Sequence, residues 1–124
     1  AHYYRAKAYL DAGKTDGAME DLKVLAKDTR NVYGAEAKYK VAQIYFDGGQ
    51  TDKAEQEVLN YIEVSTPHTY WLARSFVLLA DVYMKLGRNL DAKQYLLSLK
   101  QNYQADDDIA GMIESRLEKL KTEN

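Results

Sequence analysis

A repeated arrangement of alanine, tyrosine and glycine constrains the fold of this chain more than any other feature of its sequence. In each copy a tyrosine follows an alanine by three residues, and a glycine follows the tyrosine by four. A second alanine and two further apolar residues come next. The pattern occurs three times, with spacings of 36 and then 38 residues, at Ala6, Tyr9, Gly13, Ala18, Leu22 and Leu25, at Ala42, Tyr45, Gly49, Ala54, Val58 and Tyr61, and at Ala80, Tyr83, Gly87, Ala92, Leu96 and Leu99. Three such copies predict a repeat architecture.

Each copy is typical of two helices joined by a tight turn. The alanine and the tyrosine share one face of the first helix because they are three residues apart. The glycine suits the left-handed residue that follows a helix end. We expect Thr15, Thr51 and Asn89 to cap the second helix with their side chains. Asp16 and Asp52 then fall in its first turn, near the positive end of the helix dipole.

The chain as a whole predicts an all-α fold. Pro67 is the one proline among 124 residues, so little in the sequence interrupts helices. We expect helices at about 2–12, 16–29, 34–47, 52–64, 69–86, 90–102 and 106–121. The last helix departs from the repeat but carries one apolar stripe, which predicts that it covers the end of a stack of hairpins. Asp106, Asp107 and Asp108 are expected to supply its cap and the negative charge of its first turn.

This pattern resembles the tetratricopeptide repeat family, and the match extends over nearly the whole chain. The resemblance implies a right-handed superhelix, an α-α solenoid of three helical hairpins, forming a single domain over residues 1–124. Its repeats span about 1–32, 33–67 and 68–104, with a capping helix at 105–121. The sequence departs from the family at its early apolar positions, which read His2 and Arg5, Lys38 and Val41, and Phe76 and Leu79. The longer units are similar to those of bacterial cell-envelope proteins.

The sequence offers no catalytic or cofactor site. Gly13-Lys14-Thr15 ends like a phosphate-binding loop, but Ala8 occupies the place of the first glycine and no strand precedes it. We expect His2 at a frayed terminus and His68 in a corner between units, each without catalytic partners. The three consecutive aspartates lack the alternating ligand spacing of a calcium loop. We therefore predict that the chain is not an enzyme and binds no cofactor or metal.

One stripe of the first helix of each unit is left unused by the hairpin. In the second unit it contains two aromatic residues, Tyr39 and Phe46. The resemblance implies that such stripes line a concave groove that receives a peptide or a partner's helix. The groove would comprise Tyr3, Lys7, Leu10 and Asp11, then Glu36, Tyr39, Gln43, Phe46 and Asp47, then Arg74, Val77, Asp81, Met84 and Lys85. We expect Lys7, Tyr39, Gln43, Arg74 and Asp81 to be exposed.

The partner implied by these residues is a protein or peptide with mixed polar and apolar contacts. The carboxylate clamp of the family's chaperone-binding members is absent, because the corresponding residues are Tyr3, Lys7, Lys40, Arg74 and Leu78 and only Arg74 matches. The net charge of −2 does not favour nucleic acid, and no apolar run is long enough to insert into a membrane. The N-terminal end shows no cap, which leaves a fragment of a longer array, or a homo-oligomer, as alternatives to the interaction scaffold. A periplasmic or cell-envelope location is favoured over the cytoplasm.

Overall fold

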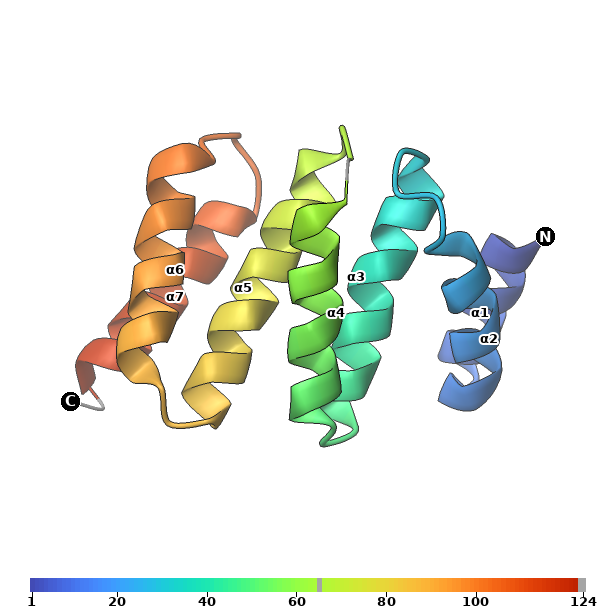
Figure 1. Ribbon diagram of the computed structural model, residues 1–124, viewed down its shortest axis with the longest axis horizontal. Coiled ribbons are helices and arrows are strands. Elements are labelled where there is room, and N and C mark those ends of the chain that lie inside the picture. The colour runs from blue at the N-terminus through green and yellow to red at the C-terminus, as the bar shows by residue number, and fades with distance from the viewer. Residues whose placement is uncertain (65, 123–124) are drawn as a thin grey trace. The chain divides into compact units, whose positions relative to one another are not determined.

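Within residues 1–64 and 66–122, which the computed structural model describes, all regular secondary structure is α-helical. The described helices are α1 (His2–Asp11), α2 (Thr15–Leu25), α3 (Val32–Asp47), α4 (Thr51–Glu63), α5 (Thr69–Lys85), α6 (Asn89–Asn102) and α7 (Ile109–Thr122). The prediction of an all-α fold is confirmed. Helices α1 and α2 pack side by side, and so do α3 and α4, as the ribbon shows (Figure 1).

The turns inside the three hairpins are built alike. Gly13, Gly49 and Gly87 have φ angles of 74°, 81° and 77°, which only glycine adopts without strain. The amide after each glycine donates to a tyrosine carbonyl, with N–O distances of 2.8 Å from Lys14 to Tyr9, 2.8 Å from Gln50 to Tyr45 and 2.7 Å from Arg88 to Tyr83. The glycine amide bonds the next carbonyl along the helix, which completes a Schellman motif.

The predicted side-chain caps at Thr15, Thr51 and Asn89 are wrong. These residues are already the first helical residues of α2, α4 and α6. The N-cap is the residue before each, Lys14, Gln50 or Arg88, and none of the three makes a side-chain cap bond. The carbonyls of these N-cap residues accept the first bond of the second helix, at 3.2 Å from Ala18, 3.0 Å from Ala54 and 3.1 Å from Ala92. In each hairpin, one residue therefore closes the Schellman motif of the first helix with its amide and serves as the N-cap of the second helix with its carbonyl. Asp16 and Asp52 do lie in the first turn, as predicted.

Helix α2 ends four residues before its predicted end because α3 packs closely against the connection. A Cβ atom on Gly34 would lie 1.9 Å from the carbonyl oxygen of Asp28, so the two backbones meet where only glycine fits. Helix α3 in turn begins two residues before its predicted start, since the Asn31 side chain accepts a 2.8 Å bond from the amide of Tyr33. Both boundaries follow from this contact and this cap.

The start of α7 also differs from the prediction. The helix begins at Ile109, not at residue 106, and its first turn contains no acidic residue. The Asp107 carboxylate accepts one bond from the Ile109 amide at 2.9 Å and another from the Tyr103 hydroxyl at 2.6 Å. Asp107 thus caps the helix from outside it, while its second oxygen fixes the preceding loop.

The connection between α4 and α5 is tied back to the connection between α2 and α3. The Thr66 hydroxyl donates to the carbonyl of Thr29 at 2.7 Å, and His68 Nε2 donates to the carbonyl of Arg30 at 2.9 Å. His68 is a corner residue, as expected. These two bonds hold together two loops that are far apart in sequence.

The chain divides into two compact units, Ala1–Leu72 and Ala73–Asn124. The core of the first unit gathers around Ala6, Ala18, Leu22, Ala37 and Val41. The second unit contains most of α5 together with α6 and α7, and α7 packs against α6. Its fully buried side chains include Leu78, Leu79, Leu96, Ile109 and Ile113. Alanines 18, 54 and 92 are completely buried, which lets paired helices approach closely.

Candidate functional site

In the first unit, Glu36 lies at the centre of the surface shared by α1 and α3. Its Oε1 accepts from the Tyr3 hydroxyl at 3.3 Å, and its Oε2 lies 2.6 Å from Lys40 Nζ. Lys7 Nζ lies 5.5 Å from the centroid of the Tyr3 ring. The predicted residues Tyr3, Lys7 and Glu36 are therefore brought together, and Lys40 joins them. We call Tyr3, Lys7, Glu36 and Lys40, with Gln43 and Asp47 further along α3, the α1/α3 face.

The Tyr3 ring anchors the N-terminal end of the α1/α3 face. Its centroid is 4.4 Å from that of Tyr33 and 5.4 Å from that of Tyr4. Burial of the hydroxyl, followed by the nearby Glu36 carboxylate, raises the pKa of Tyr3, so the phenol stays protonated and donates its hydrogen. An aromatic cluster with a polar tip at its edge suits a surface that contacts another polypeptide.

The face continues along α3 as a chain of hydrogen bonds. The Tyr39 hydroxyl donates to Gln43 Oε1 at 2.8 Å, and Gln43 Nε2 donates to Asp47 Oδ1 at 2.8 Å. Tyr39 itself is buried, with 6% of its surface exposed, so the expectation that it is exposed was wrong. Its ring packs at 5.7 Å from that of Trp71, near the start of α5. Gln43 is half-buried and Asp47 is exposed, so this series of hydrogen bonds runs from the buried Tyr39 to the surface of the protein.

The α1/α3 face is shallow. The crevice between α1 and α3, lined by Tyr3, Lys7, Leu10 and Glu36 among others, has no room for a water-sized sphere. Sites for small molecules are usually concave and larger, at roughly 300–1,000 Å³. The geometry therefore favours contact with an extended segment or a second protein surface over a small-molecule pocket.

In the second unit, the predicted residue Asp81 is engaged by α7. Arg116 donates from Nε to Asp81 Oδ1 at 2.7 Å and from Nη2 to Oδ2 at 2.9 Å, a two-pronged ion pair. Asp81 and Arg74 are half-buried, and Lys85 is exposed. Of the apolar residues assigned to the groove, Val77 is buried and Met84 is half-buried. The exposure expected for Arg74 and Asp81 is thus only partial.

A pair of residues that face each other within each hairpin was missed by the sequence reasoning. His2 Nδ1 lies 2.7 Å from Asp21 Oδ1 in the first hairpin, and Lys38 Nζ lies 3.0 Å from Glu57 Oε2 in the second. In the third hairpin, Phe76 and Tyr95 stack at 6.3 Å. The members of every pair are 19 residues apart, which is the signal that could have found them. We call these contacts the cross-helix pairs.

The first cross-helix pair corrects the expectation that His2 is frayed. Asp21 is buried, and besides His2 it accepts bonds from Arg5 Nε at 2.8 Å and from Arg5 Nη2 at 2.6 Å. The Arg5 hydrogen bonds, followed by that from His2, hold the pKa of Asp21 well below its usual value. The N-terminal residues of α1 are therefore anchored to α2.

Residues 1–64 and 66–122 contain no cluster of histidine, aspartate and glutamate side chains suited to hold a metal ion. Over the same residues, no helix combines the length and the apolar composition needed to span a bilayer. Asp107 in the triple aspartate serves as the cap described above.

Two segments of the chain match family models, and both models are described as tetratricopeptide repeat. One match covers residues 1–28, which contain the hairpin of α1 and α2, and the other covers residues 73–103, most of α5 and all of α6. No curated protein gives a significant match to the chain. The three hairpin turns have equivalent hydrogen bonds. Together with this regularity, the two matches support a tetratricopeptide repeat family for this all-α chain.

Proposed function

We propose that the chain is a non-enzymatic interaction module and that the α1/α3 face binds an extended peptide or a partner protein. Tetratricopeptide repeats generally mediate protein–protein interactions, and two segments of the chain match them. The observation that carries the proposal is the shallow face itself, on which Lys7, Glu36 and Lys40 present both signs of charge beside the Tyr3 ring. Such a surface suits a partner with alternating charged and apolar side chains.

In the second unit, we infer a separate set of binding residues on α5 from those that the resemblance assigns to a groove, Arg74, Asp81 and Lys85. In the first unit the proposed site includes Asp11, which is exposed at the end of α1, and Tyr39, Gln43 and Asp47 along α3. The long spacing of the repeats, 36 and 38 residues, resembles that of bacterial cell-envelope repeats, and on this resemblance we propose the cell envelope as the location.

A peptide selected on the protein tests this proposal. A random phage-displayed library would be selected on the wild type, and the enriched peptide would be titrated calorimetrically into variants. We expect Lys7→Ala with Asp11→Ala to weaken binding by at least about tenfold, because both side chains are exposed on α1 and a lost charged contact costs about this much. Lys93→Ala with Glu118→Ala, which removes the same two charges elsewhere, serves as the control. Equal affinity for both double variants would contradict the proposed face.

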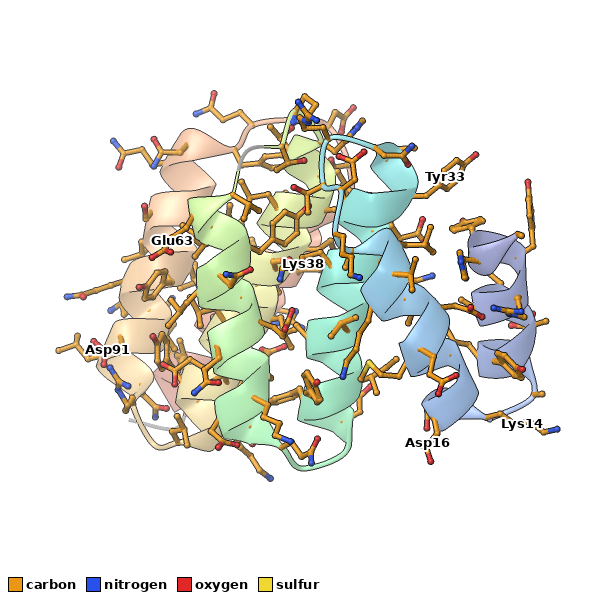
Figure 2. All side chains as sticks on the ribbon, turned by 45° about the vertical axis from the view of Figure 1, so that its right-hand side comes forward. Lys14, Asp16, Tyr33, Lys38, Glu63 and Asp91 are labelled. Carbon is orange, nitrogen blue, oxygen red and sulfur yellow. The ribbon has the colours of Figure 1, made fainter. Side chains whose placement is uncertain are left out.

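A second candidate function is self-association, and an exposed apolar patch favours it. Tyr4, Val24, Val32 and Tyr33 are 72%, 45%, 42% and 44% exposed, although all four side chains are large and apolar or aromatic. Three of them, Tyr4, Val24 and Tyr33, line a hollow of about 400 Å³. Figure 2 shows Tyr33 extending from the start of α3 on the side of α1, where its ring lies 4.4 Å from that of Tyr3. Patches of this kind commonly mark contacts with another protein chain.

Sedimentation equilibrium separates the two candidates. If the patch mediates self-association, the mean mass rises with concentration, and Tyr4→Ser with Tyr33→Ser abolishes the rise. Leu90→Ser with Leu97→Ser, at exposed apolar positions of α6, provides the matched control. A wild type that stays monomeric up to about 0.5 mM, well above the micromolar range of ordinary association, would reject this second function.

A further inference from the structure

Outside the α1/α3 face, the first unit has a cleft between α2, α3 and α4. It encloses about 400 Å³, within the range of small-ligand sites. Its polar lining comes from Lys23 in the last turn of α2, from Lys27 and Thr29 in the connection after it, from Lys38 on α3, and from Glu57 and Asn60 on α4. Figure 2 shows Lys38 between the ribbons of α3 and α4. We call this feature the α2/α4 cleft.

The α2/α4 cleft carries an excess of positive charge. Lys38 Nζ lies 3.0 Å from Glu57 Oε2 and donates to Asn60 Oδ1 at 2.7 Å, so the one carboxylate of the lining is already paired. Lys23 and Lys27 are exposed, and neither forms an ion pair within the described ranges. Lys23 Nζ instead lies 5.8 Å from the centre of the Tyr45 ring. The lining therefore has two positive charges that the protein does not neutralise.

The polar character of the cleft is not a requirement of the fold. Lys38 and Glu57 form the cross-helix pair of the second hairpin, whereas Phe76 and Tyr95 occupy the equivalent positions of the third and stack at 6.3 Å. A hairpin of this design thus accommodates aromatic residues at the two positions. Charged groups that lose part of their hydration cost free energy that an aromatic pair does not. The side chain of Lys38 is only 12% exposed, so this cost applies to it.

The helix dipole explains only part of the arrangement. A lysine in the last turn of α2 is favoured by the negative end of the dipole, and this accounts for Lys23. It does not account for Lys38, which lies in the middle of α3. An ammonium group has three N–H donors, and the bonds of Lys38 to Glu57 and Asn60 use two of them. One donor therefore remains to bond a group that enters the cleft.

We propose that the α2/α4 cleft binds a small anionic molecule through an oxyanion group, either a phosphate or a pair of carboxylates. Lys23 and Lys27 supply the charge that attracts the anion. Lys38 and the exposed Asn60 supply hydrogen-bond donors in the lining of the cleft, and the Tyr45 ring forms an apolar wall. This site lies on different side chains from those of the α1/α3 face, so each can be removed without the other.

Titrations followed by amide NMR test the site with two probes, inorganic phosphate and succinate, in low-salt buffer. We expect saturable shifts at Lys23, Lys27, Lys38 and Asn60 with at least one probe, and the tighter probe identifies the oxyanion. Lys23→Gln with Lys27→Gln should weaken binding by at least about tenfold, because two charged contacts are lost. Both lysines are exposed, so this variant should keep the fold.

Lys14→Gln with Lys93→Gln serves as the matched control, with the same change in net charge at exposed positions. Gln50 occupies the position equivalent to Lys14 in the second hairpin, so this exchange suits the turn. Lys14 also points away from the helices (Figure 2). The proposal is overturned if neither probe gives saturable shifts in the cleft, or if the two double variants bind equally well. It is also overturned if glycerol, which is neutral, reproduces the shifts.

Discussion

Lys38 and Glu57 bridge α3 and α4 at 3.0 Å, in the place where the third hairpin has a stacked phenylalanine and tyrosine. The two solutions to one packing problem differ in their dependence on a partner. An aromatic side chain still stabilises the fold by burying apolar surface when its neighbour is replaced. A half-buried charge that loses its partner destabilises the fold. Mutants that convert one solution into the other can therefore measure what the ion pair costs the fold.

We predict that Lys38→Phe with Glu57→Tyr is at least as stable as the wild type. The double variant installs the pair found in the third hairpin and removes the desolvation of two charges. Glu57→Tyr alone should lower the free energy of unfolding by about 1–2 kcal/mol, because Lys38 keeps its charge and loses its carboxylate. Urea denaturation of the three proteins checks both statements. A double variant less stable than the wild type would contradict the first statement, and a single variant as stable as the wild type would contradict the second.

Replacing Asp21 should destabilise the first hairpin in a pH-dependent manner. The folded protein holds the pKa of Asp21 low through Arg5 and His2, so the carboxylate stabilises the fold fully above its unfolded pKa of about 3.9. That contribution is lost as the pH falls from there through the lower folded pKa. We expect Asp21→Asn to lower Tm by roughly 5 °C at pH 5 and by less at pH 3. Calorimetry at the two pH values measures the difference, and an equal loss at both would contradict this assignment.

Alanine at the turn glycines should destabilise the protein, while alanine at Gly111 should not. Gly49 has a φ of 81°, where a Cβ atom costs about 1–2 kcal/mol. Gly111 lies inside α7 with open space around the position of a Cβ, so alanine there should add about 0.5–1 kcal/mol of stability. Chemical denaturation of Gly49→Ala and Gly111→Ala checks that the two effects have opposite signs. A stabilising Gly49→Ala would show that the turn adopts another geometry in solution.

The ion pair between Arg116 and Asp81 should control how firmly α7 is held. Arg116→Met keeps an unbranched apolar side chain but removes the two hydrogen bonds to Asp81 and a third to the Met112 carbonyl, which should cost about 1–2 kcal/mol because the pair is half-buried. We expect faster hydrogen exchange in the amides of α7, with little change in α1. Lys121→Met, at an exposed position of the same helix, should leave exchange unchanged. Uniform protection in both variants would mean that the apolar residues of α7 suffice to hold it.

The sequence predicted features that follow from backbone geometry and burial. Ala18, Ala54 and Ala92 are buried because the paired helices pack closely there. The three turn glycines have positive φ, a conformation that is strained for a residue with a Cβ atom. Side-chain caps were predicted wrongly for a physical reason. Two consecutive helices share a single residue at each turn, and a threonine one residue later has already entered the second helix.

The candidate site was predicted less well than the fold, because its residues depend on contacts between distant segments. Helical periodicity placed Tyr39 on an unused stripe, but Trp71 approaches from the start of α5 and buries its ring. The sequence predicted a frayed end at His2, but in the folded protein the His2 side chain lies 2.7 Å from that of Asp21. Periodicity within one helix gives the direction of a side chain, but it does not predict which residues of other segments pack against that side chain.

The shared residue at the hairpin turns determines where this protein can change its length. An extra amino acid inserted between Gly13 and Thr15 would separate the two hydrogen-bonded ends and rotate the second helix by about 100°, which would carry its buried face out of contact. The distance from tyrosine to alanine across the turn is accordingly the same in all three hairpins, and the difference between the 36- and 38-residue spacings lies outside it. Loops between hairpins are therefore the places to graft a tag, a fluorophore or a new recognition segment.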